Sequence, residues 1–389
     1  MQRLWLLLAV ITLSLTGFAQ TPDPAKIADL NKRAIDALVA KKYDDGIQLF
    51  TQLLELRPQD KGTAYNLACA CSLKGDVDAG ITWLDKACTW GWGAGQGQIY
   101  GDQKTVSEID MCRQDADLEN LRKDARFEPL LAKMQVNVEK RKELQKKADA
   151  YAATAATYVP EALKTAAEVP LLVVVHDGGA TKDQIVGGFW KGVADELGFA
   201  LVAPSGKFMA ADEPAKGMAW FEDVNEYFDP KSSWKSEKPI HDAVSAFKKE
   251  RKVDATRVVL VGEGSMGSLV AYGAGISSPG LYKVVVAVDG AFAPQMIEAK
   301  LASAAKMGQK AAVLWDLRAT ANASMEEKPQ LEAAVAAMQK SLADAGAGAV
   351  TKYTSDANDA GVRKKAVVEL IKSLATGAAA KPVEAGAGK

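Results

Sequence analysis

The chain has little cysteine. Four of its 389 residues are cysteines, at positions 69, 71, 88 and 112, and their spacing matches no zinc-binding pattern. Cys69 and Cys71 lie two residues apart on an expected helix, so their side chains point in different directions and should not bridge each other. A Cys88–Cys112 disulfide stays open, but we favour four buried thiols that pack as small apolar side chains. The sequence predicts no metal site and no cofactor.

The chain also lacks an excess of charge and, beyond its start, a long apolar run. Lys and Arg number 48 against 49 Asp and Glu, so the net charge of −1 gives no electrostatic reason to expect nucleic acid or an anionic membrane as a partner. No run after residue 15 approaches the roughly 18 apolar residues that a membrane span requires. The remaining composition, 48% hydrophobic and 25% charged, is that of a globular protein with room for two or three domains.

The first 19 residues are typical of a signal peptide. Arg3 supplies the positive start, Leu4–Leu15 is an apolar run too short for a confident membrane span, and Gly17-Phe18-Ala19 offers the small residues that a signal peptidase reads. We expect cleavage after Ala19 and prefer it to an uncleaved anchor. The mature chain should then be exported, to the periplasm or the outside, with no membrane span.

Histidine is the scarcest of the residues that matter for catalysis. The only two, His176 and His241, both precede Ser265. Around that serine, Arg257–Gly267 predicts a buried strand, a tight Gly-rich turn and a helix, the layout that presents the nucleophile of a serine hydrolase. Such a serine needs a general base, usually a histidine supplied later in the chain. The sequence therefore predicts the scaffold of a hydrolase without its usual base.

The N-terminal part shows a helical repeat. Ile27–Val39 and Tyr43–Leu56 predict a helical pair, and the pattern returns about 34 residues later. Tyr65–Cys69 and Trp83–Ala87 resemble a tetratricopeptide repeat, and Asp115–Leu131 resembles the capping piece that often follows such repeats. The resemblance implies an all-α domain over residues 25–136 whose groove takes a peptide or protein partner. That the repeats only pack against the neighbouring domain stays open.

The rest of the chain predicts an α/β domain. Residues 137–158 are charged and predict a solvated helical linker. Residues 159–375 alternate helical stretches with continuous apolar runs, which mark strands buried on both faces of a doubly wound, mostly parallel sheet. The tail 376–389 is rich in Ala and Gly and should be disordered. The expected strands are Leu171–Val175, Ala200–Ala203, Val258–Val261, Val284–Val288 and Ala311–Leu314.

Four stretches of this domain resemble the α/β-hydrolase superfamily, nearest to its polyhydroxybutyrate-depolymerase-like and carboxylesterase-like esterases. They are Val169–Gly179, Trp190–Gly206, Val253–Gly267 and Tyr282–Gly290. The resemblance implies a binding site for a small ester or acyl ligand, at an oxyanion-type loop and at the turn around the nucleophile. Its residues would be His176, Asp177, Gly178, Gly179, Gly264 and Met266.

The catalytic positions depart from the family pattern Gly-x-Ser-x-Gly. If Ser265 is the nucleophile, Glu263 occupies the place of the first glycine; if Gly262 is that glycine, the nucleophile position is Gly264 and no nucleophile exists. Both alignments stay open. Asp316 is the candidate acid, although it comes early, and Thr320–Asn322 lies where the acid is expected.

The base position also departs from the pattern. The loop Tyr353–Gly361 offers Asp and Asn, and an aspartate is a far weaker base than imidazole at neutral pH. His176 is better explained as a structural residue of the oxyanion-type loop, and His241 as a surface or packing residue. We therefore expect an exported two-domain protein whose hydrolase domain has lost catalysis and serves in binding or scaffolding. The alternative is an atypical carboxylic-ester hydrolase that uses Ser265.

Overall fold

The computed structural model describes residues 24–98, 105–211, 213–221, 227, 234–290, 294–317, 327–354 and 360–376. The predicted signal peptide and the tail from residue 377 onward lie outside these ranges. The chain divides into two compact units between Leu144 and Gln145, and each is described by itself.

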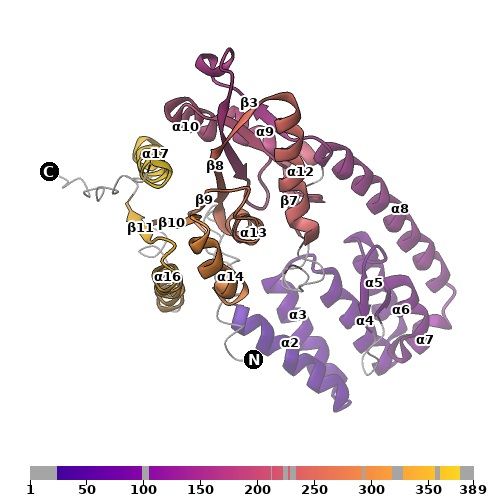
Figure 1. Cartoon of the computed structure of the whole chain (residues 1–389). Coiled ribbons are helices and arrows are strands. Elements are labelled where there is room, and N and C mark those ends of the chain that lie inside the picture. Colours follow the sequence, from indigo (N-terminus) through magenta and orange to yellow (C-terminus); the bar gives the residue numbers. More distant parts are fainter. Residues whose placement is uncertain are drawn as a thin grey trace. The chain divides into compact units, whose positions relative to one another are not determined.

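The first unit begins with four helices that are consistent with a helical repeat (Figure 1). The third and fourth of these helices start at capping residues, because the carboxylates of Asp60 and Asp76 accept hydrogen bonds from the backbone N–H groups of Thr63 and Ala79. Their apolar faces bury residues such as Phe50 and Leu84. The helices are α2 (Pro24–Val39), α3 (Tyr43–Leu56), α4 (Lys61–Lys74) and α5 (Val77–Thr89).

A short hairpin and further helices complete this unit. All four cysteines are buried free thiols, so the prediction of buried thiols is confirmed. The predicted boundary at residue 136 falls inside one continuous helix, α8, which runs on through most of the charged segment. The elements are β1 (Gln96–Gln98), β2 (Thr105–Ser107), α6 (Glu108–Gln114), η1 (Ala116–Leu118), α7 (Glu119–Arg122) and α8 (Phe127–Ala152), whose residues from Gln145 onward belong to the second unit.

The second unit is built on a seven-stranded sheet of order β11-β10-β9-β8-β4-β5-β3. Every neighbouring pair is parallel except β3 and β5. All five predicted strands are present; the short strands β3 and β11 were not predicted. The strands are β3 (Ala156–Tyr158), β4 (Val169–Val175), β5 (Ala200–Ala203), β8 (Val253–Glu263), β9 (Val284–Val288), β10 (Lys310–Asp316) and β11 (Val350–Tyr353).

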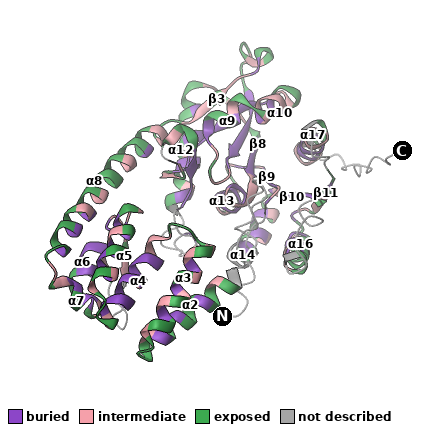
Figure 2. Ribbon diagram, turned by 180° about the vertical axis from the view of Figure 1, so that it is seen from behind, coloured by how far each residue is buried: buried purple, intermediate pink, exposed green. Residues whose placement is uncertain are grey.

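Both faces of this sheet are covered by helices, which explains the continuous apolar runs. In β4, Leu171, Val173 and Val175 enter one core, while Leu172 and Val174 enter the other. The central strands β4, β5, β9 and β10 are buried, and the outer sides of the helices are exposed (Figure 2). One face carries α12 (Trp234–Glu250), α13 (Gly264–Ile276), α14 (Pro294–Lys306) and α16 (Glu327–Asp344); the other carries α9 (Lys182–Gly187), α10 (Phe189–Leu197) and α17 (Ala360–Thr376).

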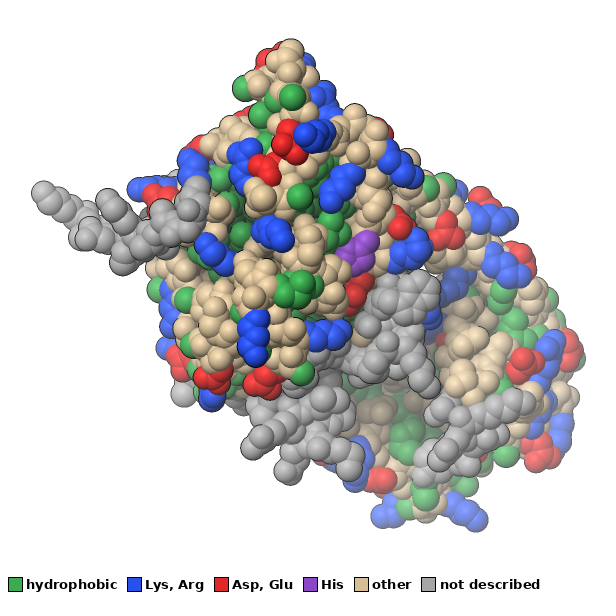
Figure 3. Space-filling view, in the orientation of Figure 1, with side chains coloured by type: hydrophobic (Ala, Val, Ile, Leu, Met, Phe, Trp, Pro, Cys, Tyr) green, Lys and Arg blue, Asp and Glu red, His purple; other side chains and the backbone are tan. Residues whose placement is uncertain are grey.

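A mostly parallel sheet between two helical layers fits an α/β-hydrolase fold. Acidic and basic side chains are interspersed over the face seen in Figure 3, in keeping with the balanced charge. None of the helices in the described part of the chain is long and apolar enough to cross a membrane.

Candidate functional site

The strand-to-helix turn after β8 has a glycine at its apex. β8 ends at Glu263 and α13 begins at Gly264, whose φ of +65° lies in the left-handed region that favours glycine. Two residues earlier, Gly262 has no room for a side chain, because an added Cβ would lie 2.3 Å from the carbonyl oxygen of Gly267. The backbone therefore agrees with the alignment that takes Gly262 as the first glycine of the pattern. In that alignment the apex is Gly264, which has no side chain.

Ser265 lies in the first turn of α13, one residue past the apex. Its side chain is half-buried, and among the described residues no hydrogen bond reaches its hydroxyl. The buried Ser268 hydroxyl, in contrast, donates to the Gly262 carbonyl oxygen at 3.0 Å and holds the turn. A nucleophilic serine requires a base within hydrogen-bond reach, and the described residues place none at Ser265.

Asp177, two residues past the end of β4, fills the space beside the apex. A Cβ added to Gly264 would lie 2.1 Å from its Oδ2 atom. Its Oδ1 atom accepts a 2.8 Å hydrogen bond from the N–H of Met266, at the start of α13, where the helix dipole favours a negative charge. Burial raises the pKa of the Asp177 carboxyl above its usual range, against the opposing effect of the backbone N–H groups around it. A carboxylate of the chain itself thus occupies the first amides of this helix.

His176 holds the loop that carries Asp177. Its ring is fully buried, and its Nε2 atom accepts the N–H of Gly206 at 3.2 Å. The proton therefore sits on Nδ1, which donates to the Asp177 carbonyl oxygen at 2.7 Å. Burial lowers the pKa of His176 to about 4, so the ring is neutral near pH 7. Both ring nitrogens are engaged in holding the backbone.

The two predicted loop glycines lie beside this arrangement. A Cβ on Gly178 would lie 3.2 Å from the Met266 methyl carbon, so the two segments are in close approach. The N–H of Gly179 donates to the Met218 carbonyl oxygen at 2.9 Å. That N–H group is therefore already paired.

An ion-pair cluster occupies the neighbouring strand ends. Arg363, in the first turn of α17, donates to Asp289 at 2.8 Å and to Glu263 at 2.8 Å. The Tyr353 hydroxyl donates to Asp289 at 2.8 Å, and the Trp190 indole N–H donates to Glu263 at 2.9 Å. Each carboxylate thus has a charged and a neutral donor. Strand-end carboxylates and a basic residue opening the last helix were visible in the sequence, but their pairing was not predicted.

The candidate acid lies beside this cluster, in register with Tyr353, and the second histidine lies on a helix. Asp316 is the last residue of β10 and is buried. His241 lies on α12 with its Nδ1 atom 3.1 Å from the Tyr282 hydroxyl, a packing contact. Thr320–Asn322 and residues 355–359, where the family would supply its acid and base, lie outside the described residues. The structure brings Asp177, Gly264 and Met266 together, whereas no hydrogen bond between described residues joins Ser265 to Asp316.

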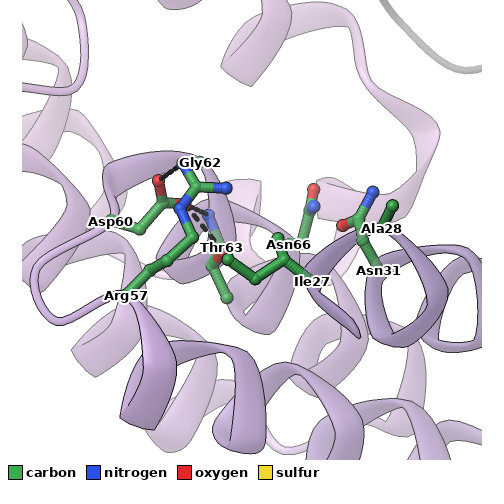
Figure 4. A pocket seen from close by; sticks show the side chains of 8 residues that line it. All are labelled: Ile27, Ala28, Asn31, Arg57, Asp60, Gly62, Thr63 and Asn66. Atoms are coloured by element: carbon green, nitrogen blue, oxygen red, sulfur yellow. Dashed lines mark hydrogen bonds and ion pairs between the residues drawn. The ribbon is translucent and has the colours of Figure 1, made fainter. Parts of the chain in front are cut away.

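The helical unit has a groove between α2 and α4. A cavity of about 390 Å³ lies there, lined by residues of both helices and of the turn before α4 (Figure 4). Asn31 projects from α2 and Asn66 from α4, and neither side-chain amide has a hydrogen-bond partner among the residues that the structure describes. The Asp60 carboxylate, in contrast, accepts from Arg57 and Thr63. Two unpaired amides are the groups that could bind the backbone of an extended peptide.

One group in the described ranges has the residue types of a metal site. The ligand atoms of Cys69, Asp115 and Asp117 lie within 4.8 Å of one another. Both oxygens of Asp115 are engaged, however, one by the Tyr65 hydroxyl at 2.7 Å and one by the N–H of Asp117 at 3.0 Å. Burial and the neighbouring carboxylates raise the pKa of the Cys69 thiol, which disfavours the thiolate that binds metals.

Comparison with known proteins gives similarity in structure only. No protein-family model and no curated protein matches the chain. Among solved structures, esterase PE8 is similar at 15% identity, over 57% of this chain and 98% of that one, with a TM-score of 0.44. An uncharacterized protein from Bacillus cereus ATCC 10987 is similar at 15% identity, over 89% of this chain and 98% of that one, with a TM-score of 0.39. A carboxylesterase from Mesorhizobium loti is similar at 16% identity, over 52% of this chain and 88% of that one, with a TM-score of 0.38.

Proposed function

We propose that this chain is an exported two-domain protein. A tetratricopeptide-like helical module binds a peptide or protein partner, and an esterase-like α/β-hydrolase domain has lost catalysis and serves in binding or scaffolding.

The observation that carries the loss of catalysis is the apex of the turn. Gly264 has the positive φ that the strained turn gives to a nucleophile, but it has no side chain. Asp177 fills the place that a nucleophilic side chain would need. A carboxylate there would also repel the negative charge that develops on a carbonyl oxygen during acyl transfer.

The surroundings support the same proposal. A base could act only with a free ring nitrogen, and those of His176 are both engaged. An oxyanion hole needs free N–H groups aimed at the reacting oxygen, whereas the N–H of Met266 binds Asp177 and the N–H of Gly179 binds Met218. The alternative, ester hydrolysis by Ser265, would need a base that the described residues do not supply.

Turnover of short acyl esters tests the loss of catalysis. With p-nitrophenyl butyrate, the wild-type chain and Ser265→Ala should show the same rate as buffer with an inert protein. A wild-type rate that disappears in Ser265→Ala would support the atypical esterase instead.

The groove between α2 and α4 supports a binding role for the helical module. Asn31 and Asn66 lie on equivalent first helices of the two repeats and leave their amides for a peptide backbone. Capture from a periplasmic extract with the full chain tests this role. We expect the wild type to retain a partner and the double variant Asn31→Ala/Asn66→Ala to lose it. Asp36→Asn, an exposed change outside the cavity lining, is the control and should retain the partner. Equal capture by all three proteins would contradict this role.

Export rests on the residues at the start of the chain. N-terminal sequencing of the protein from cells should give Gln20 as the first residue. A protein that still begins at Met1 would contradict cleavage.

A further inference from the structure

A second cavity of about 560 Å³ lies in the helical unit and shares Gly62 and Asn66 with the groove. It is deep, because several side chains that line it are almost fully buried. Its aromatic wall is Tyr65 stacked on Trp92, with ring centres 4.3 Å apart. Its apolar lining includes Ile35, Leu38, Val39, Leu73 and Met111.

The polar part of the lining carries two carboxylates and a single lysine. Asp115 and Asp117 both line the cavity, and neither carboxylate forms a salt bridge with a described Lys or Arg, although Arg122 donates to the backbone oxygen of Asp115. The Asp115 carboxylate receives neutral hydrogen bonds from the Tyr65 hydroxyl, the Cys69 thiol and the N–H of Asp117, whereas no described donor reaches the Asp117 carboxylate. Burial, and then the charge of Asp115, raise the pKa of Asp117, so its ionised form lacks stabilisation. Lys41 is the one basic residue that the described lining contains.

A long side chain with a cationic end would complement this cavity. The methylene stem of Lys or Arg packs along apolar surface while its charged head seeks a polar partner. Hydrogen bonds from a cation to a carboxylate are among the strong ones. A neutral apolar side chain would leave both carboxylates without a cationic partner, and an acidic one would add a third negative charge.

We propose that this cavity takes a Lys or Arg side chain of a peptide bound in the adjoining groove, with Asp117 and Asp115 receiving the cation. The proposal rests on the binding role proposed for the helical module and adds the class of residue that its partner must carry. Asp117 is the residue that determines this specificity, because its carboxylate has no described partner in the free protein.

Selection from a random heptapeptide display library on the full chain tests the proposal. The wild type should enrich peptides with Lys or Arg at one fixed position, and Asp117→Asn should lose that preference. Asp36→Asn is the matched control and should keep it. Unfolding curves of both variants should match that of the wild type, and Asp117→Glu, which keeps the charge, should retain a basic preference.

Binding of the best selected peptide then gives the magnitude. Replacing its basic residue by Gln should weaken binding to the wild type about tenfold, and should leave binding to Asp117→Asn nearly unchanged. Enriched peptides without a basic position, or an equal loss in both proteins, would overturn the cation site while the binding role of the module stands. A library that yields no enriched peptide would contradict both the cation site and the binding role of the helical module. The proposed loss of catalysis would be unaffected.

Discussion

The strand-end site of the α/β unit and the groove of the helical unit differ in what their polar groups do. At the strand ends, Asp177, Glu263, Asp289 and Arg363 are all engaged by groups of the chain itself. In the groove, the amides of Asn31 and Asn66 have no partner among the described residues. Internal pairing stabilises a fold and leaves little for a reactant, while unpaired groups remain available to a ligand. The polar groups at the strand ends are therefore paired within the chain, whereas the two amides of the groove have no described partner.

The largest expected effect is the loss of Arg363. Arg363→Ala leaves the carboxylates of Glu263 and Asp289 without their cation in a partly buried place, so we expect a loss of about 3 kcal/mol in the free energy of unfolding. The neighbouring Lys364→Ala, whose side chain pairs with the more exposed Glu196, should cost less than about 1 kcal/mol. Chemical denaturation measures both. Equal costs would mean that the cluster does not hold the strand ends together.

His176 should make stability depend on pH. Its pKa of about 4 in the folded chain lies below the unfolded value near 6.5, so between these values the unfolded chain binds a proton that the folded chain excludes. Stability should therefore fall as the pH drops from 6.5 to 4, by about 3 kcal/mol in total. The slope should shrink in His176→Asn and largely persist in His241→Asn. A wild-type slope unchanged in His176→Asn would contradict a buried neutral ring.

Gly264→Ala should cost about 2 kcal/mol, because the new Cβ meets Asp177 and the positive φ is unfavourable. If the contact with Asp177 is part of the cost, Asp177→Gly should recover roughly 1 kcal/mol of it in the double variant. Gly280→Ala, where a Cβ has open space, should change stability by less than about 0.5 kcal/mol. Strictly additive costs would show that Asp177 does not fill the apex.

The smallest effect is expected in the groove. Asn66→Ala should change the free energy of unfolding by less than about 0.5 kcal/mol, because its amide has no described partner to lose. Asn137→Ala is the matched comparison, since that amide donates to the carbonyl oxygens of Cys88 and Trp92, and it should cost about 1 to 2 kcal/mol. A large cost at Asn66 would show that the groove is held internally, like the strand ends.

Much of the fold could be predicted because its central strands are continuous apolar runs. Val284–Val288 and Ala200–Ala203 coincide with β9 and β5. The edge strand β11 was missed because its four residues include Thr351 and Lys352 and carry no apolar run. The start of α12 is hard to read from the sequence, because the helix begins at Trp234 and runs through Pro239, a residue that usually ends or kinks a helix.

The site was less predictable, since it depends on contacts between distant segments. The sequence left two alignments of the turn open, because nothing local distinguishes Gly264 from Ser265 as its apex. The positive φ and the carboxylate of Asp177, which comes from another strand, are visible only in three dimensions. The pairing of Arg363 with Asp289 has the same origin, as 74 residues separate them.

Intact-mass measurement after treatment with a fluorophosphonate probe tests the central claim most directly. If the apex carries no nucleophile and Ser265 has no base, the wild-type mass should stay unchanged under conditions that label an active serine hydrolase fully. Stoichiometric addition of one probe to the wild type, absent in Ser265→Ala, would contradict the account.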